Sequence, residues 1–105
     1  MREIDVRELA QWRTGGRTFM LLDVREPHEL ATAAIAGAHH IPMREIPGRT
    51  SELPMDQEIV VICHHGGRSE RVAGFLEAQG FTAVINLEGG IAAWSEQIDP
   101  SVPTY

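Results

Sequence analysis

The stretch Ile-Val-Val-Ile-Cys-His-His-Gly-Gly-Arg-Ser, residues 59–69, decides the fold of this chain. Residues 59–62 are all β-branched and apolar, and so short a run predicts a strand that is buried on both faces of a sheet. Residues 63–68 predict a loop with two glycines. An amphipathic pattern over 69–79, followed by Gly80, predicts a helix that ends at that glycine. A buried strand, a short loop and a helix in this order are typical of an α/β domain.

The same alternation of strands and helices continues on both sides of this stretch. The first expected helix begins at the N-cap residue Asp5, with Glu8 reaching back to cap it. Pro27 suits the first position of the next helix. The expected elements are a helix over 6–15, a strand over 19–23, a helix over 28–33, a brief strand over 39–41, short helical pieces within 43–57, a strand over 83–86 and a helix over 90–96.

Length and charge limit the classes of function. We expect residues 1–105 to form one domain, because this length suits a single core. A net charge of −6 disfavours nonspecific binding to nucleic acid or to an anionic membrane. No stretch approaches the roughly 20 apolar residues of a membrane-spanning helix, and the N-terminus lacks the pattern of a secretion signal. We therefore expect a cytoplasmic protein with no nucleic-acid or membrane partner.

The single cysteine, Cys63, stands where a parallel α/β sheet places its ligands, at the carboxyl end of a strand and before a helix. A helix N-terminus lowers the pKa of a thiol because it stabilises the thiolate. Gly66 and Gly67 let successive backbone N–H groups point at one anion, and Arg68 adds a fixed positive charge. A lone cysteine is often only a small buried apolar residue. These neighbours favour a catalytic nucleophile instead.

Other polar groups carry less specific predictions. His64 and His65 are adjacent in sequence, as are residues 39–40, and neither pair has further ligands in sequence reach, so we expect no metal site. Asp23 and Arg25 follow the strand over 19–23 and open on the same edge of the sheet. They predict either a group that orients the substrate or the loop, or a salt bridge that ties loops together, and we favour the salt bridge.

Three blocks of the sequence resemble the single-domain rhodanese family, and they cover nearly the whole chain. The first block comprises Leu-Leu-Asp-Val-Arg-Glu-Pro at 21–27, Ala-Gly-Ala at 36–38 and Ile-Pro at 41–42. The second is the stretch over 59–69 quoted above. The third comprises Gly-Phe at 80–81 and Asn-Leu-Glu-Gly-Gly-Ile-Ala-Ala-Trp at 86–94, and the tail over 99–105 is also similar. Because all three blocks occur in the order that the family has, together they make the resemblance stronger than any one block does.

The resemblance implies a rhodanese-like three-layer fold with a central, mostly parallel sheet of five strands flanked by helices. It also implies a thiosulfate sulfurtransferase without a cofactor. Cys63 would take a sulfane sulfur from thiosulfate or a persulfide donor and pass it to cyanide or to a thiol, such as that of thioredoxin or another sulfur-relay protein. Arg68 would hold the anionic end of the donor, and Ser69 would donate to the sulfur. The substrate-binding residues implied in this way are His64, His65, Gly66, Gly67, Arg68 and Ser69.

Two features of the sequence depart from the family pattern and leave the preferred donor open. Ala34 stands where relatives often have histidine. His64 stands where they often have a basic residue, and a histidine is only partly charged near neutral pH. Two other functions compete with the sulfurtransferase. A phosphatase of the cell-cycle type shares the fold, but its loop has five residues between cysteine and arginine, and this chain has only four. A non-enzymatic module that relays sulfur or binds a partner is the second alternative.

Overall fold

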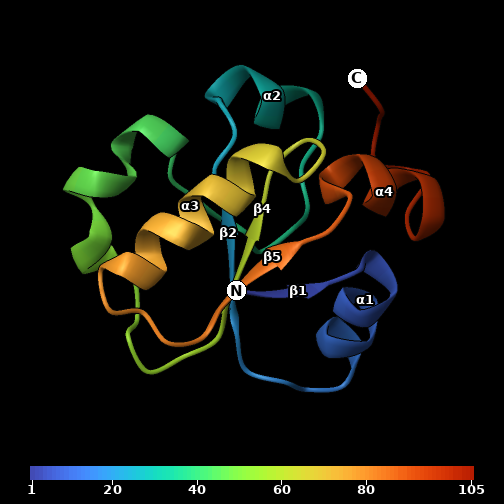
Figure 1. Cartoon of the computed structure of the whole chain (residues 1–105). Coiled ribbons are helices and arrows are strands. Elements are labelled where there is room, and N and C mark those ends of the chain that lie inside the picture. The colour runs from blue at the N-terminus through green and yellow to red at the C-terminus, as the bar shows by residue number, and fades with distance from the viewer.

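The computed structural model describes residues 1–105, which form a sheet of five strands with helices on both faces (Figure 1). The strands lie in the order β1-β5-β4-β2-β3, and every neighbouring pair is parallel. The prediction of an α/β fold with a five-stranded, mostly parallel sheet is confirmed. The strands are β1 (Arg2–Ile4), β2 (Met20–Asp23), β3 (His39–His40), β4 (Ile59–Ile62) and β5 (Val84–Leu87).

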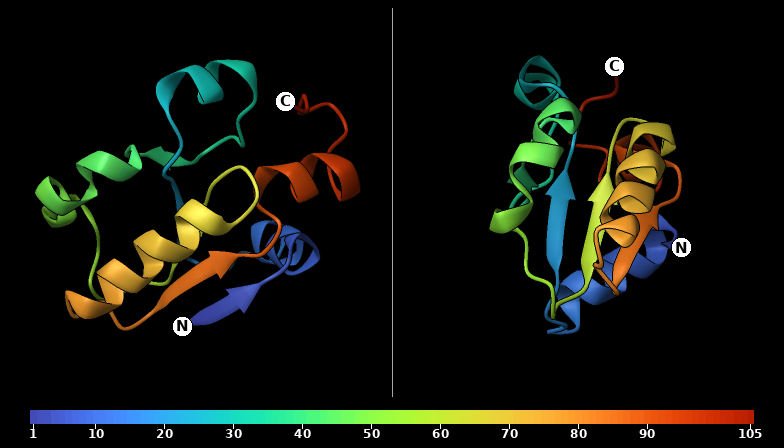
Figure 2. Two further views of the ribbon diagram at one scale, coloured as in Figure 1. Left: turned by 45° about the horizontal axis from the view of Figure 1, so that its top comes forward. Right: turned by 60° about the vertical axis from the view of Figure 1, so that its left-hand side comes forward.

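The helices form the two outer layers of the domain. Packing places α3 and the 3₁₀ segments on one face of the sheet, and α1 and α4 on the other (Figure 2). None of these helices has both the length and the apolar character needed to cross a bilayer. They are α1 (Val6–Thr14), α2 (Pro27–Thr32), α3 (Gly67–Ala78) and α4 (Gly90–Gln97), with 3₁₀ segments η1 (Met43–Gly48) and η2 (Thr50–Glu52).

The central strand β4 shows why its sequence is apolar without interruption. Val60 and Ile62 belong to the core under α1 and α4, whereas Val61 and Cys63 belong to the core under α3. Successive side chains of a strand point to opposite faces, so a strand between two helical layers buries all of them. The same alternation turns the side chain of Cys63 toward α3.

Several element boundaries differ from the prediction. β1 was not predicted, because only Ile4 of its three residues is buried and no periodic pattern marks it. α3 begins at Gly67, two residues earlier than expected. Asp5 caps α1 by accepting from the backbone N–H of Glu8 at 2.9 Å, but the Glu8 carboxylate lies beside Arg2 and gives no reciprocal cap. The predicted end of α3 is confirmed by a hydrogen bond of 3.1 Å from the N–H of residue 81 to the C=O of residue 76.

Candidate active site

Cys63 lies directly after β4, at the carboxyl edge of the sheet. The loop that follows β4 leads into α3 (Figure 1). Cys63 is buried, with 1% of its surface exposed, and it is the only cysteine of the chain. The loop that begins at Cys63 connects the central strand β4 to the first turn of α3. The position predicted for this thiol from the sequence is therefore the one that it occupies.

Hydrogen-bond donors converge on the sulfur of Cys63. The backbone N–H of Gly66 donates to Sγ at 3.0 Å, and Oγ of Ser69 lies 3.4 Å from Sγ. Burial raises the pKa of the thiol, but the Ser69 hydroxyl and the backbone N–H groups of Ser69, Gly66 and Arg68 outweigh it, so the pKa of Cys63 is lowered. These donors favour the thiolate, the form in which cysteine is a nucleophile.

Gly66 gives this cradle its shape. It is the N-cap residue of α3 and has a φ of 116°, in the left-handed region that other residues rarely adopt. This conformation turns its N–H back toward Cys63 and starts the helix directly behind the sulfur. The partial positive charge at the N-terminus of α3, a helix of 12 residues, then adds to the stabilisation of an anion there.

A chain of buried hydrogen bonds fixes Ser69 beside the sulfur. Its single hydroxyl proton has alternative acceptors, Oδ1 of Asn86 on β5 and, when Cys63 is a thiolate, Sγ, and Nδ2 of Asn86 donates to the carboxylate of Glu3 at 2.9 Å. Both Ser69 and Asn86 are buried. Asn86 had no predicted role, because 17 residues separate it from Ser69 and only the pairing of β4 with β5 brings it to the site.

The N-terminus of α4 holds the first part of the loop. The N–H groups of Ile91 and Ala92 donate to the carbonyls of Cys63 and His64 at 2.9 and 3.0 Å. Gly90, with a φ of 58°, permits this approach, because a Cβ atom built there would lie 2.5 Å from both carbonyl oxygens. Two helix N-termini thus meet at the loop, one at the sulfur and one at the backbone.

Arg68 lies beside the loop as predicted, but its guanidinium is paired with Glu29 on α2; its binding of the anionic end of a donor stays a prediction. Its two terminal nitrogens donate to the two carboxylate oxygens of Glu29 on α2, at 2.7 and 2.8 Å. Tyr105 also donates to Glu29, at 2.8 Å. The bonds from Arg68, although burial opposes them, hold the pKa of Glu29 far below its usual range. The charge of Arg68 is therefore already compensated.

Asp23 and Arg25 form the ion pair that the sequence analysis favoured. Nη2 of Arg25 lies 2.7 Å from Oδ2 of Asp23, and both side chains are fully buried. The guanidinium also donates to the carbonyl of Ala33 and to the hydroxyl of Tyr105, both at 2.8 Å. These contacts tie the end of β2 to α2 and to the C-terminal tail; an orienting role for the pair in the reaction stays a prediction.

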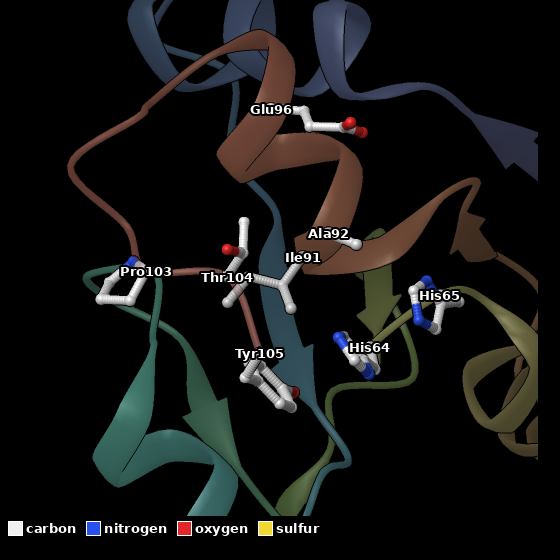
Figure 3. A pocket seen from close by; sticks show the side chains of 8 residues that line it. All are labelled: His64, His65, Ile91, Ala92, Glu96, Pro103, Thr104 and Tyr105. Carbon is white, nitrogen blue, oxygen red and sulfur yellow. The ribbon is translucent and has the colours of Figure 1, made fainter.

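The two adjacent histidines lie beside the C-terminal tail. The ring of His64 stacks on that of Tyr105, with a centroid distance of 3.9 Å and an angle of 6° between the rings, and His65 lies 3.9 Å on its other side. Figure 3 shows both histidines and Tyr105 around a pocket of about 370 Å³. Burial first, and then the proximity of the His65 imidazole, lower the pKa of His64. Both effects favour the neutral imidazole of His64.

A shallow depression of about 340 Å³ surrounds Cys63. It opens at the loop and the first two turns of α3. One of its residues, Arg71, was not predicted from the sequence, although its spacing of three from Arg68 places both on one face of a helix. The lining residues are Cys63, His64, His65, Gly67, Arg68 and Arg71.

Comparison with known proteins agrees with this geometry. The Rhodanese-like domain family matches residues 5–97. A protein of Allochromatium vinosum named sulfurtransferase is 39% identical over 102 residues, which cover 97% of this chain and 95% of that protein. A chloroplastic Arabidopsis thaliana protein named rhodanese-like/PpiC domain-containing protein 12 is 45% identical over 89 residues, which cover 81% of this chain but only 30% of that protein.

Solved structures give the same result. The crystal structure of a rhodanese-like domain protein from Staphylococcus aureus has a TM-score of 0.87 and 30% identity to this chain, with 100% of this chain and 99% of that chain covered. Several relatives are named sulfurtransferases, and at this coarse level they support sulfur transfer by this chain. The parallel five-stranded sheet, the matched residues and these relatives show that the chain belongs to the rhodanese-like domain family.

Proposed function

We propose that this protein is a sulfurtransferase that carries a sulfane sulfur as a persulfide on Cys63. The observation that carries the proposal is the convergence of donors on Sγ, with the N–H of Gly66 at 3.0 Å and the hydroxyl of Ser69 at 3.4 Å. A persulfide ends in a negatively charged sulfur, and fixed donors aimed at an anion in a buried site are an effective form of electrostatic stabilisation. The site therefore suits both the thiolate and the persulfide.

In the proposed first step, the Cys63 thiolate attacks the outer sulfur of a thiosulfate-type donor. A new S–S bond forms at Cys63, the S–S bond of the donor breaks, and its electron pair leaves with sulfite. In the second step, cyanide or a thiolate attacks the terminal sulfur of the persulfide, giving thiocyanate or a new persulfide and restoring the Cys63 thiolate. Each step is a balanced displacement at sulfur, so no external oxidant or reductant takes part.

The loop size favours sulfur over phosphate. Four residues separate Cys63 from Arg68, and the N–H groups that lower the pKa of the thiol already point at Sγ. A small ring of amides suits one additional sulfur atom, whereas a phosphate needs a wider ring of donors around three oxygens. Phosphatase activity is the alternative outcome of the test below.

The test is the mass of the intact protein after incubation with thiosulfate. We expect an increase equal to one sulfur atom, removed again by cyanide with release of thiocyanate, and no increase in Cys63→Ser. A wild-type protein that gains no sulfur, or a Cys63→Ser variant that gains it equally, contradicts the proposal. Hydrolysis of a phenyl phosphate without any sulfur adduct would indicate the phosphatase instead.

A further inference from the structure

The distribution of positive charge over the chain is uneven. The chain has nine arginines and no lysine. Six of them pair with carboxylates, and Arg13 donates to a backbone carbonyl and lies over the ring of Trp94. Only Arg7 and Arg71 have neither a carboxylate nor a hydrogen-bond partner. The paired arginines are Arg2, Arg17, Arg25, Arg44, Arg49 and Arg68.

At the Cys63 depression, this distribution separates two arginines that the sequence alone does not distinguish. Arg68 is held by both carboxylate oxygens of Glu29, which is itself buried, so an anion that binds Arg68 has to compete with a formed ion pair. Arg71 lies one turn further along α3, is exposed, and lines the same depression. It is the one arginine there whose charge is not compensated.

The other groups around the depression do not replace this charge. The chain as a whole carries −6, which repels an anion at long range. Burial lowers the pKa of His64, which favours its neutral imidazole. Because Sγ is buried, a donor whose outer sulfur meets Sγ would extend its sulfonate group away from the sulfur, into the depression that Arg71 lines.

We propose that Arg71 is the specificity residue that binds the anionic end of the sulfur donor, an inference that rests on the proposed sulfur transfer at Cys63. A guanidinium on an exposed wall attracts a sulfonate by charge and by hydrogen bonds. No contact joins Arg71 to Sγ, so it acts on the binding of the donor rather than on the making and breaking of S–S bonds. Removing its charge should raise KM for the donor and leave kcat nearly unchanged.

Arg7 provides a matched control, since it is an exposed and unpaired arginine that does not line the depression. In Arg71→Gln we expect KM for thiosulfate to rise about tenfold with kcat changed by less than about twofold, the low end of a charge-assisted contact. High salt should reduce the difference from wild type. Arg71→Lys should recover most of the loss, and Arg7→Gln should change KM by less than about twofold.

A second measurement makes the inference independent of sulfur transfer. Iodoacetate and iodoacetamide alkylate the same thiol and differ mainly in that the first is an anion. In Arg71→Gln, but not in Arg7→Gln, the rate ratio of iodoacetate to iodoacetamide at Cys63 should fall about fivefold, the upper end of what one exposed ion pair contributes. An unchanged ratio and an unchanged KM overturn the inference. If the ratio falls in Arg71→Gln but the wild-type protein gains no sulfur from thiosulfate, the proposed function is overturned. Anion binding by Arg71 is then still supported.

Discussion

Gly90 is the position at which one added methyl group should do most harm to the active loop. A Cβ atom there would lie 2.5 Å from the carbonyl oxygens of Cys63 and His64 and 2.7 Å from the carbonyl carbon of His64. These are backbone atoms, so they cannot turn aside as a flexible side chain does. The Gly90→Ala variant must therefore move the N-terminus of α4 away from the loop.

The loss of folding stability in Gly90→Ala has two parts. Alanine in the left-handed region, which a φ of 58° requires, costs about 1 kcal/mol. Moving α4 away also strains the bonds that Ile91 and Ala92 donate to the same two carbonyls at 2.9 and 3.0 Å, each of which stabilises the fold by about 1 kcal/mol. We expect a total loss of about 3 kcal/mol, which a domain of ordinary stability tolerates without unfolding.

Gly16→Ala is the matched control, since Gly16 has a φ of 76° but no atom within 4 Å of its Cβ position. We expect circular dichroism during heating to show Tm lowered by roughly 15 °C in Gly90→Ala and by roughly 5 °C in Gly16→Ala. At a temperature where both variants are folded, only Gly90→Ala should add sulfur more slowly. Equal falls in Tm, or a normal rate of sulfur addition in Gly90→Ala, would refute the reasoning about close approach.

Two other predictions concern titratable groups. Ser69→Ala removes a donor to the sulfur, so the pKa of Cys63 should rise. The rate of Cys63 alkylation by iodoacetamide, plotted against pH, should then have its inflection at higher pH. Ser95→Ala removes a buried hydroxyl elsewhere and should leave the inflection in place. Glu29→Gln should destabilise the fold by roughly 2 kcal/mol near neutral pH, because it removes a charged partner of Arg68. The pKa of Glu29 is lowered in the folded state, so the stability that its carboxylate contributes is present above the usual carboxylate range and is lost as the pH falls. In urea unfolding, the difference in free energy of unfolding between Glu29→Gln and wild type should therefore be smaller at about pH 3 than near neutral pH. An equal difference at both pH values would contradict this assignment.

Much of the fold and the place of the Cys63 thiol in it could be predicted from the sequence, whereas its role as the nucleophile stays a prediction. The run over 59–62 indicates a strand buried on both faces, and Cys63 directly after it falls at the carboxyl edge of the sheet. These predictions succeed because they rest on local patterns, namely β-branching, periodicity and the glycine that ends a helix. β1 was missed for the same reason, since three residues with one buried side chain form no pattern.

Only the tertiary structure decided the electrostatics of the site. Arg68 and Arg71 both follow the loop as cations in the sequence, but Glu29 neutralises only Arg68, from 39 residues away. Likewise, Asn86 reaches Ser69 only because β5 pairs with β4. The sequence determined that a thiol stands at the end of a buried strand, because backbone propensity and burial are encoded within a few residues. Which charges remain free beside that thiol depends on side chains that meet only when distant elements pack.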